Sequence, residues 1–305
     1  MDRSTPLPKV SVIISTYNRP HLIARAVLSA LGQTYGNMEI VVVDADPTGK
    51  TAEALAPLVK KHPNVVDFVF KQMPPTGTLK DLRNIARNRN AGIRIAKGDY
   101  IAPLDDDDTW PDPRKIERQV EFFESHPDYS IVFGNLSGTN EDDNNKEEIA
   151  YFPADDKEIR KYALMPGGIM TSTVMYRKSD WEKVGGYDET VVLESLDFHL
   201  TLGMIGKMKC LPYLFVHYAM GENKYAHAPA YGRACLRNGL VTIWKFRGYP
   251  GFVKAFLFQL MYFLYAFVPY RIRTGMRPFA RKIQTVLLAR FSGVDRKIFQ
   301  RSERE

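Results

Sequence analysis

Four consecutive aspartates, residues 105–108, are the side chains in this sequence best suited to chemistry. They follow a short apolar run, residues 100–104. Like charges this close repel one another, so a folded protein tolerates them through a divalent cation, hydrogen bonds or open solvent. Because Cys and His are absent from this stretch, its oxygen ligands favour a hard ion, Mn²⁺ or Mg²⁺, shared with substrate phosphates. The alternative is a solvated acidic turn, since Asp is common in turns and at helix N-caps.

Short apolar runs alternate with helical patterns along the first half of the chain. The predicted strands are 10–16, 39–44, 65–70, 100–104 and 129–133, and the predicted helices are 22–31, 51–61, 82–97 and 111–125. This alternation predicts parallel strands in an open α/β sheet. Ligand sites in such sheets lie beyond the carboxyl ends of the strands. We therefore expect Asp44, at the end of the second strand, to face the same crevice as residues 105–108.

The second half is predicted in less detail. Residues 140–148 are polar and acidic, which indicates a surface loop. Residues 169–176 are predicted to form a strand and residues 179–184 a helix, followed by a glycine-rich turn at 185–189.

Cysteine content and charge bound the environment of the protein. The chain of 305 residues has two cysteines, too few for a disulfide framework, so we expect a reducing compartment. Its first nine residues carry no apolar signal segment, which favours the cytosol or the inner face of its membrane. Residues 222–305 hold 16 Lys/Arg against 4 Asp/Glu, a net charge of +12, and the rest of the chain has a net charge of −5. We predict a catalytic domain at 1–220 and a helical, basic and aromatic region at 221–305.

The apolar block at 251–269 indicates which kind of partner the basic region contacts. It is too short for a confident transmembrane span, which needs about 20 apolar residues. A helix at the membrane interface, an oligomerising helix and a hairpin packed on the catalytic domain all remain open. Basic residues from Arg271 to Lys282 follow, as beside a cytoplasmic membrane surface, and residues 283–291 form a second amphipathic pattern. Nucleic acid is excluded as a partner because the aromatic residues form one block and are not interleaved with basic ones.

Four stretches taken in order carry a family resemblance: Val10 to Arg19, Glu39 to Asp44, Arg89 to Gly92 running into Leu104 to Asp108, and Gly185 to Glu189 followed by Glu194 to Leu200. Their order and spacing resemble the inverting family 2 glycosyltransferases. The resemblance implies the GT-A fold, a Rossmann-like open mixed sheet, here with a C-terminal helical, basic, membrane-associating extension. It also implies transfer of a sugar from a nucleoside diphosphate donor to an acceptor hydroxyl, with inversion.

The resemblance assigns roles to individual residues. Those on the donor side would be Thr16, Tyr17, Arg19, Asp44, Arg89, Asn90, Asp105 and Asp106. Asp107 and Asp105 would bind Mn²⁺ or Mg²⁺. His217, and with less support His227, stands where relatives sometimes place a further metal or diphosphate ligand.

The catalytic base is where this chain departs from the family. The family usually has a Glu-Asp pair at the start of a late helix, and here the pair reads Glu194-Ser195. A serine is a poor general base, so Glu194 is ranked first and Asp197 second. Both could instead be acidic residues that favour the start of a helix.

The sequence and this resemblance thus favour a metal-dependent, single-addition glycosyltransferase, with a UDP-sugar as the favoured donor and a lipid-linked or cell-surface glycan precursor as the acceptor. It would lie peripherally on the cytoplasmic face of an anionic membrane and could form a homo-oligomer through its C-terminal region. The signature Gln-x-x-Arg-Trp of processive synthases is absent. The alternatives are a catalytically silent glycosyltransferase-like binding or scaffold protein and a sugar-nucleotide nucleotidyltransferase, although the glycine-rich phosphate loop expected of the latter is missing.

Overall fold

The computed structural model describes residues 6–45, 48–69, 80–139, 146–164, 168–191, 193–219, 229–265 and 295–300. Its strands are β1 (Val10–Thr16), β2 (Met38–Asp44), β3 (Val65–Val69), β4 (Tyr100–Asp105), β5 (Tyr129–Thr139), β6 (Lys146–Tyr151), β7 (Tyr176–Arg177), β8 (Lys207–Ala219) and β9 (Asp295–Gln300). Its helices are α1 (Pro20–Leu31), α2 (Lys50–Lys61), α3 (Lys80–Ile95), α4 (Lys115–Ser125), α5 (Asp156–Tyr162), α6 (Lys178–Val184), α7 (Glu194–Ile205), α8 (Pro229–Lys245) and α9 (Phe252–Tyr265), with a 3₁₀ turn at Thr171–Thr173.

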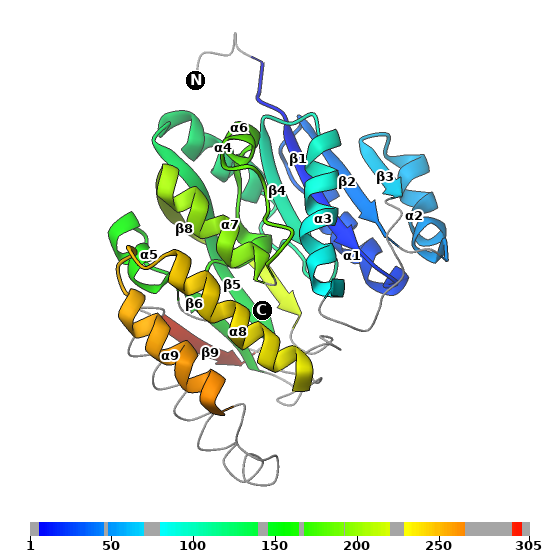
Figure 1. The fold of residues 1–305 in the computed structure, drawn as a ribbon. Coiled ribbons are helices and arrows are strands. Elements are labelled where there is room, and N and C mark those ends of the chain that lie inside the picture. Colours follow the sequence, from blue (N-terminus) through cyan, green and yellow to red (C-terminus); the bar gives the residue numbers. More distant parts are fainter. Residues whose placement is uncertain are drawn as a thin grey trace.

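Two sheets form the centre of the molecule (Figure 1). The first has the order β3-β2-β1-β4-β7, in which β1 to β4 are parallel and β7 is antiparallel. The second has the order β8-β5-β6-β9. The parallel strands β1, β2 and β4 end at the same edge, because Thr16 is in register with Asp44 and Ser15 with Asp105.

Helices cover both faces of the first sheet. On β1, Val12 and Ile14 face one hydrophobic cluster with Ile23 and Ala26 of α1, whereas Ile13 faces another. The cluster around Ile13 contains side chains of α3, α7, α8 and α9. The two-residue period of the strand thus divides the core into two layers.

Helix α3 lies unusually close to the sheet at Gly92. A Cβ atom on Gly92 would stand 2.5 Å from Val43 Cγ2 and 3.0 Å from Ile13 Cγ2. Glycine therefore sets how near α3 can approach, and so where the side chains of Arg89 and Asn90 lie.

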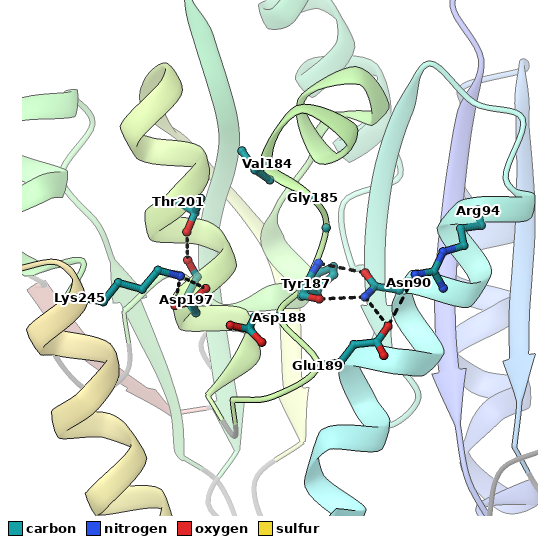
Figure 2. A pocket seen from close by; sticks show the side chains of 11 residues that line it. Asn90, Arg94, Val184, Gly185, Tyr187, Asp188, Glu189, Asp197, Thr201 and Lys245 are labelled. Atoms are coloured by element: carbon teal, nitrogen blue, oxygen red, sulfur yellow. Dashed lines mark hydrogen bonds and ion pairs between the residues drawn. The ribbon is translucent and has the colours of Figure 1, made fainter.

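The side chain of Asn90 holds the turn between α6 and α7 (Figure 2). Its Nδ2 donates to the Tyr187 carbonyl oxygen at 2.9 Å, and its Oδ1 accepts from the Tyr187 N–H at 3.0 Å. Gly185 and Gly186 in this turn have φ angles of +83° and +79°, which favour glycine. Helix α7 is thereby fixed relative to α3.

The predicted strands and helices of the first half are present, with small shifts at their ends. Strand β5 continues to Thr139, six residues beyond the prediction, and Phe70 lies outside the described residues. Helix α4 begins at Lys115 and not at Pro111, because Asp112 precedes a second proline and is disfavoured in helical conformation.

Two predictions for the second half are wrong. Residues 169–176 form a 3₁₀ turn and only the start of β7. Thr173 Oγ1 donates to the Met170 carbonyl at 2.6 Å, a local bond that competes with strand pairing. Residues 146–148, within the predicted surface loop, belong to β6, which pairs with β5 and β9. Their polar sequence gave no sign of a strand. Residues 140–145 of that predicted loop lie outside the described residues.

Helices α8 and α9 form a hairpin against α5 and α7. Tyr249, between the two helices, donates from its hydroxyl to the Leu200 carbonyl at 3.0 Å. Gly251, at φ +82°, lets the chain pass close to the Lys161 carbonyl. In the described part of the chain, no helix is long and apolar enough to cross a membrane. The predicted division at residue 220 and His227 fall outside the described residues. The same holds for the end of the apolar block at 266–269, the basic residues from Arg271 to Lys282 and residues 283–291.

Candidate active site

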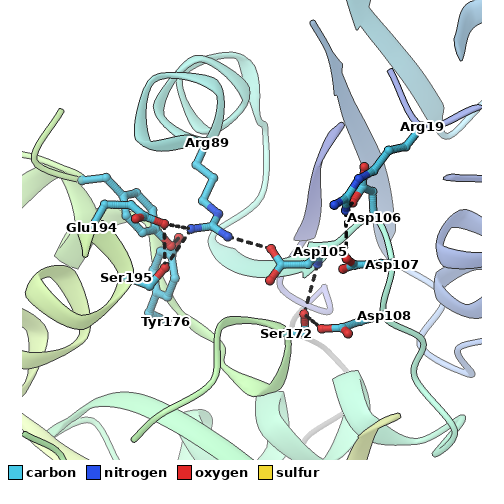
Figure 3. Close-up of polar contacts among 11 residues, drawn as sticks. Arg19, Arg89, Asp105, Asp106, Asp107, Asp108, Ser172, Tyr176, Glu194 and Ser195 are labelled. Atoms are coloured by element: carbon cyan, nitrogen blue, oxygen red, sulfur yellow. Dashed lines mark hydrogen bonds and ion pairs between the residues drawn. The ribbon is translucent and has the colours of Figure 1, made fainter. Parts of the chain in front are cut away.

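The acidic loop leaves the end of β4 at the edge where β1 and β2 also end. Asp105 Oδ1 accepts a hydrogen bond from Arg89 Nη2 at 2.6 Å (Figure 3). Asp108 is buried, and its Oδ2 accepts from Ser172 Oγ at 2.5 Å. The same Ser172 Oγ accepts the Asp105 N–H at 3.1 Å. Ser172 therefore clamps both ends of the loop.

The two central aspartates turn toward the loop after β1. Thr16 Oγ1 donates to Asp106 Oδ2 at 2.7 Å. Arg19 Nη1 donates to Asp106 Oδ1 at 3.0 Å and to Asp107 Oδ2 at 2.8 Å. Asn18 turns the chain between them with φ +51°, a conformation that Asn tolerates better than most residues. The end of β1 and the loop after it thus place a hydroxyl and a guanidinium against the acidic loop.

Two further residues predicted on the donor side, Asp44 and Tyr17, lie at the same edge, whereas Asn90 does not. Asp44 closes β2 and is 1% exposed, and Tyr17, next to Thr16, is partly buried. Asn90 lies elsewhere: its amide is used in the clamp on Tyr187 and also donates to Glu189 Oε1 at 2.9 Å. Its position therefore supports a role in holding α3 and α7 together.

Arg89 connects the acidic loop to helix α7. Its Nη1 donates to Glu194 Oε1 at 2.6 Å and to Ser195 Oγ at 2.8 Å, while its Nη2 reaches Asp105. Burial alone would lower the pKa of Arg89, but the carboxylates of Asp105 and Glu194 hold that pKa above its ordinary value. One buried guanidinium thus spans the two sides of the site.

The surroundings of the acidic loop raise the pKa values of its two central aspartates and so disfavour their charged forms. Burial raises the pKa of Asp106 to about 6, against the lowering effect of Arg19 and Thr16. Burial, followed by the charge of Asp105, raises the pKa of Asp107. A second cation placed here would relieve both effects.

A divalent cation fits this donor set. The side chains of Asp105 and Asp107 are 35% and 23% exposed, so both can reach a ligand arriving from solvent. Within the described ranges, no three His, Cys, Asp or Glu side chains are arranged as a complete metal site. Asp105 and Asp107 alone would supply only part of a coordination sphere, and Mg²⁺ commonly completes such a sphere with water and substrate phosphates.

The two candidate bases have different surroundings. Glu194 begins α7, and its Oε1 accepts from both Arg89 and Ser195 Oγ, the latter at 2.9 Å. Asp197 is one turn further along, and both of its oxygens accept from Lys245 Nζ, at 2.7 and 2.8 Å. Glu194 is thus joined to the acidic loop through Arg89, while Asp197 is joined to α8.

Asp197 lies beside a separate cavity of about 400 Å³ between α3, α7 and α8 (Figure 2). The cavity is lined by Asn90, Arg94, Val184, Gly185, Gly186, Tyr187, Asp188, Glu189, Asp197, Thr201 and Lys245. Its charged side chains are of both signs.

His217 lies next to the acidic loop through its backbone. Its N–H donates to the Thr109 carbonyl at 2.9 Å, and the Thr109 N–H donates back at 3.2 Å. Its ring Nδ1 is 2.6 Å from Ser137 Oγ. This hydrogen bond fixes the orientation of the imidazole on β8.

Sequence reasoning did not identify Ser172 or the buried Lys115. Trp110 Nε1 donates to the Ser172 carbonyl at 2.8 Å. Lys115 is fully buried, donates to Gln119 Oε1 at 2.8 Å and lies 4.0 Å from the Trp110 ring centroid; its burial lowers its pKa well below the usual value. The bond between Trp110 and Ser172 joins residues 62 apart in the chain, so no local motif could have shown it.

Comparison with known proteins agrees with this geometry. The model of glycosyl transferase family 2 matches residues 11–184, more than half of the chain, and the chain belongs to this family. It is a glycosyltransferase with the GT-A fold.

Three curated relatives are between 26% and 29% identical to this chain over the matched residues. A glycosyltransferase of Nostoc sp. is 29% identical over 72% of this chain and 67% of its own length. The amylovoran biosynthesis glycosyltransferase AmsE of Erwinia amylovora is 26% identical over 64% of this chain and 70% of its own. A glycosyltransferase of Methanocaldococcus jannaschii matches over 61% of each chain, so this chain spans less than two thirds of that relative.

Solved structures show the same fold at low identity. The mannosyltransferase PcManGT from Pyrobaculum calidifontis, in complex with GDP-Man and Mn²⁺, has a TM-score of 0.60 and 18% identity over 85% of this chain and 70% of its own. S. aureus TarS 1–349, in complex with UDP-GlcNAc, has a TM-score of 0.57 and 19% identity over 77% of this chain and 66% of its own.

Proposed function

We propose that this protein is a metal-dependent, inverting glycosyltransferase that moves one sugar from a nucleoside diphosphate donor to a glycan hydroxyl. A UDP-sugar is the favoured donor. The acceptor we propose is a lipid-linked or cell-surface glycan precursor at the cytoplasmic face of a membrane. The observation that carries the proposal is the Arg89 bridge, because it joins the donor-side carboxylate Asp105 to the candidate base Glu194.

On the donor side, Asp107 and Asp105 would hold Mn²⁺ or Mg²⁺. The ion, when bound, would neutralise the charge that develops on the departing diphosphate. Thr16, Tyr17, Arg19 and Asp44 would surround the nucleoside. His217 stays a candidate for a further contact with the metal or diphosphate, with its ring oriented by Ser137.

On the acceptor side, Glu194 would accept the proton of the attacking hydroxyl. The hydroxyl oxygen forms a bond to the anomeric carbon, the bond from that carbon to the diphosphate oxygen breaks, and the electron pair leaves with the nucleoside diphosphate. Both described contacts of Glu194 fall on Oε1, so we assign proton transfer to Oε2. Asp197 is the weaker candidate because Lys245 engages both of its oxygens.

The test is release of nucleoside diphosphate from UDP- and GDP-sugars with and without Mn²⁺, supplied with a membrane lipid extract as acceptor source. Glu194→Gln should lower the rate at least 100-fold with little change in donor affinity, as expected for loss of a general base. Asp197→Asn is the matched control and should retain most of the rate.

Three outcomes oppose the proposal in different ways. Equal rates for Glu194→Gln and the wild type would contradict the base assignment. A loss of rate in Asp197→Asn but not in Glu194→Gln would assign the general base to Asp197. Donor binding without turnover by the wild type would favour the silent binding protein.

A further inference from the structure

The hairpin of α8 and α9 has one face packed on the enzyme and one face exposed. On the packed face, Ile243 of α8, Phe246 directly after that helix and Ala255 of α9 are buried in the cluster shared with α7. Gln259 of α9 donates to the Leu236 carbonyl of α8 at 3.1 Å. Figure 1 shows α8 lying between α7 and α9, with α9 outermost.

The exposed face is apolar. We call it the outer hairpin face and define it as Val241, Trp244, Val253, Leu257, Met261 and Leu264. On α9 its members recur every three or four residues, which places them on one side of the helix. Val253 is 65%, Leu257 58% and Leu264 59% exposed. Large apolar residues exposed singly are ordinary, but a continuous stripe marks a contact surface.

Aromatic side chains extend this face to α8. Trp244, 54% exposed, packs edge to face on Phe252 with ring centroids 5.9 Å apart and lies 5.8 Å from the Phe256 centroid. The two helices thus present their apolar side chains as one surface. Tryptophan is enriched where one part of a ring meets apolar chains and another meets water.

The charge of the hairpin selects the partner. Residues 229–265 contain five Arg and Lys and no Asp or Glu. Arg237, Arg247 and Lys254 are exposed at the ends and sides of the hairpin. A second copy of the chain would bring the same positive charge to the contact, so self-association through this face is disfavoured. An anionic surface with an apolar layer beneath it satisfies both features.

We infer that the outer hairpin face docks on anionic lipid, with its apolar residues inserted at the level of the acyl chains and its cations at the headgroups. The inference rests on the membrane part of the proposed function and specifies it. The 14 residues of α9 give a helix of about 21 Å, shorter than the ~30 Å hydrocarbon core, so the helix lies along the surface. Because Lys245 binds Asp197 on α7, docking holds the catalytic helix at a fixed distance from the lipid.

Sedimentation with vesicles tests the inference. The full chain should bind vesicles of phosphatidylcholine and phosphatidylglycerol (3:1) at least tenfold more strongly than phosphatidylcholine alone, and 0.5 M NaCl should weaken that binding. The double variant Val253→Ser/Leu257→Ser should bind the anionic vesicles at least tenfold more weakly than the wild type. Leu28→Ser on α1 is the matched control, because Leu28 is 54% exposed and stands outside the face; it should bind like the wild type.

Several results would overturn the inference. These are no binding to anionic vesicles by the wild type, equal binding by the double variant with an unchanged circular dichroism spectrum, or a dimer that the double variant abolishes. Nucleotide release from donor sugars without vesicles is measured in parallel. Release without vesicle binding would reject the docking face alone, whereas vesicle binding without release under any condition would reject the proposed transfer alone.

Discussion

Arg89 is the residue on which the geometry of the site depends most. A guanidinium can donate to Asp105 and to Glu194 at once because its N–H groups point in fixed directions. The ammonium of a lysine keeps the charge but cannot reproduce that fork. The distance between the Asp105 and Glu194 carboxylates therefore depends on an arginine at this position.

We predict that Arg89→Lys lowers kcat about 100-fold through misplacement of the reacting groups. It should also reduce the free energy of unfolding by about 1–3 kcal/mol, since a buried hydrogen bond is lost. Steady-state kinetics and urea unfolding measure the two effects. Arg94→Lys on the exposed side of α3 is the control, and an unchanged kcat in Arg89→Lys would refute the bridging role.

His199 makes stability depend on pH. Burial, with the nearby charge of Arg89, lowers the pKa of His199 to about 3, and its Nε2 has no hydrogen-bond partner among the described residues. The unfolded chain takes up a proton below its own pKa of about 6.5, whereas the folded protein does not. Stability from this group is therefore present above pH 6.5 and is lost as the pH falls toward 3.

At pH 5 the loss should be about 2 kcal/mol relative to pH 7. Urea unfolding of the wild type and of His199→Gln at both pH values isolates this effect, because other titrating groups are common to both proteins. The variant should lose less stability on acidification. Equal losses in the two proteins would show that His199 is accessible to protons when folded.

At the scale of elements, the approach of α3 to the sheet sets the position of Arg89. Gly92→Ala would place a methyl group 2.5 Å from a methyl of Val43, inside any normal contact. Overpacking of about 1–3 kcal/mol should exceed the ~1 kcal/mol gained from better helix propensity. Thermal unfolding measures the balance, with Arg94→Ala as the helix-surface control. A more stable Gly92→Ala protein would contradict the close packing.

The elements themselves were largely predictable. Strands such as β1 and β2 and helices such as α1 show their periodicity within about ten residues, and the ends of parallel strands then place Asp44 and Asp105 together. The 3₁₀ turn at Thr171–Thr173 was not predictable, because Ser172 is held by groups more than 60 residues away. The pairs Arg89–Glu194 and Lys245–Asp197 have the same long-range origin.

At the scale of the whole molecule, an ion pair between Lys245 and Asp197 joins the C-terminal hairpin to α7. Lys245→Met removes both bonds to Asp197, whose side chain is only 5% exposed. We expect a loss of about 1–3 kcal/mol in unfolding free energy, because a buried carboxylate loses its partner. The double variant Asp197→Asn/Lys245→Met should lose less unfolding free energy than the sum of the losses in the two single variants. Strict additivity in this cycle would mean that the pair does not couple the hairpin to α7.

The central claim is that the acidic loop binds a nucleoside diphosphate sugar together with a divalent cation. Calorimetric titration of UDP- and GDP-sugars into the wild type, Asp107→Asn and Glu121→Gln, each with Mn²⁺ or with EDTA, tests it most directly. Glu121 is an exposed carboxylate on α4 and serves as the control. The account predicts donor binding that requires Mn²⁺, falls at least tenfold in Asp107→Asn and is unchanged in Glu121→Gln. Donor binding of equal strength in EDTA, or in Asp107→Asn with Mn²⁺, would contradict it.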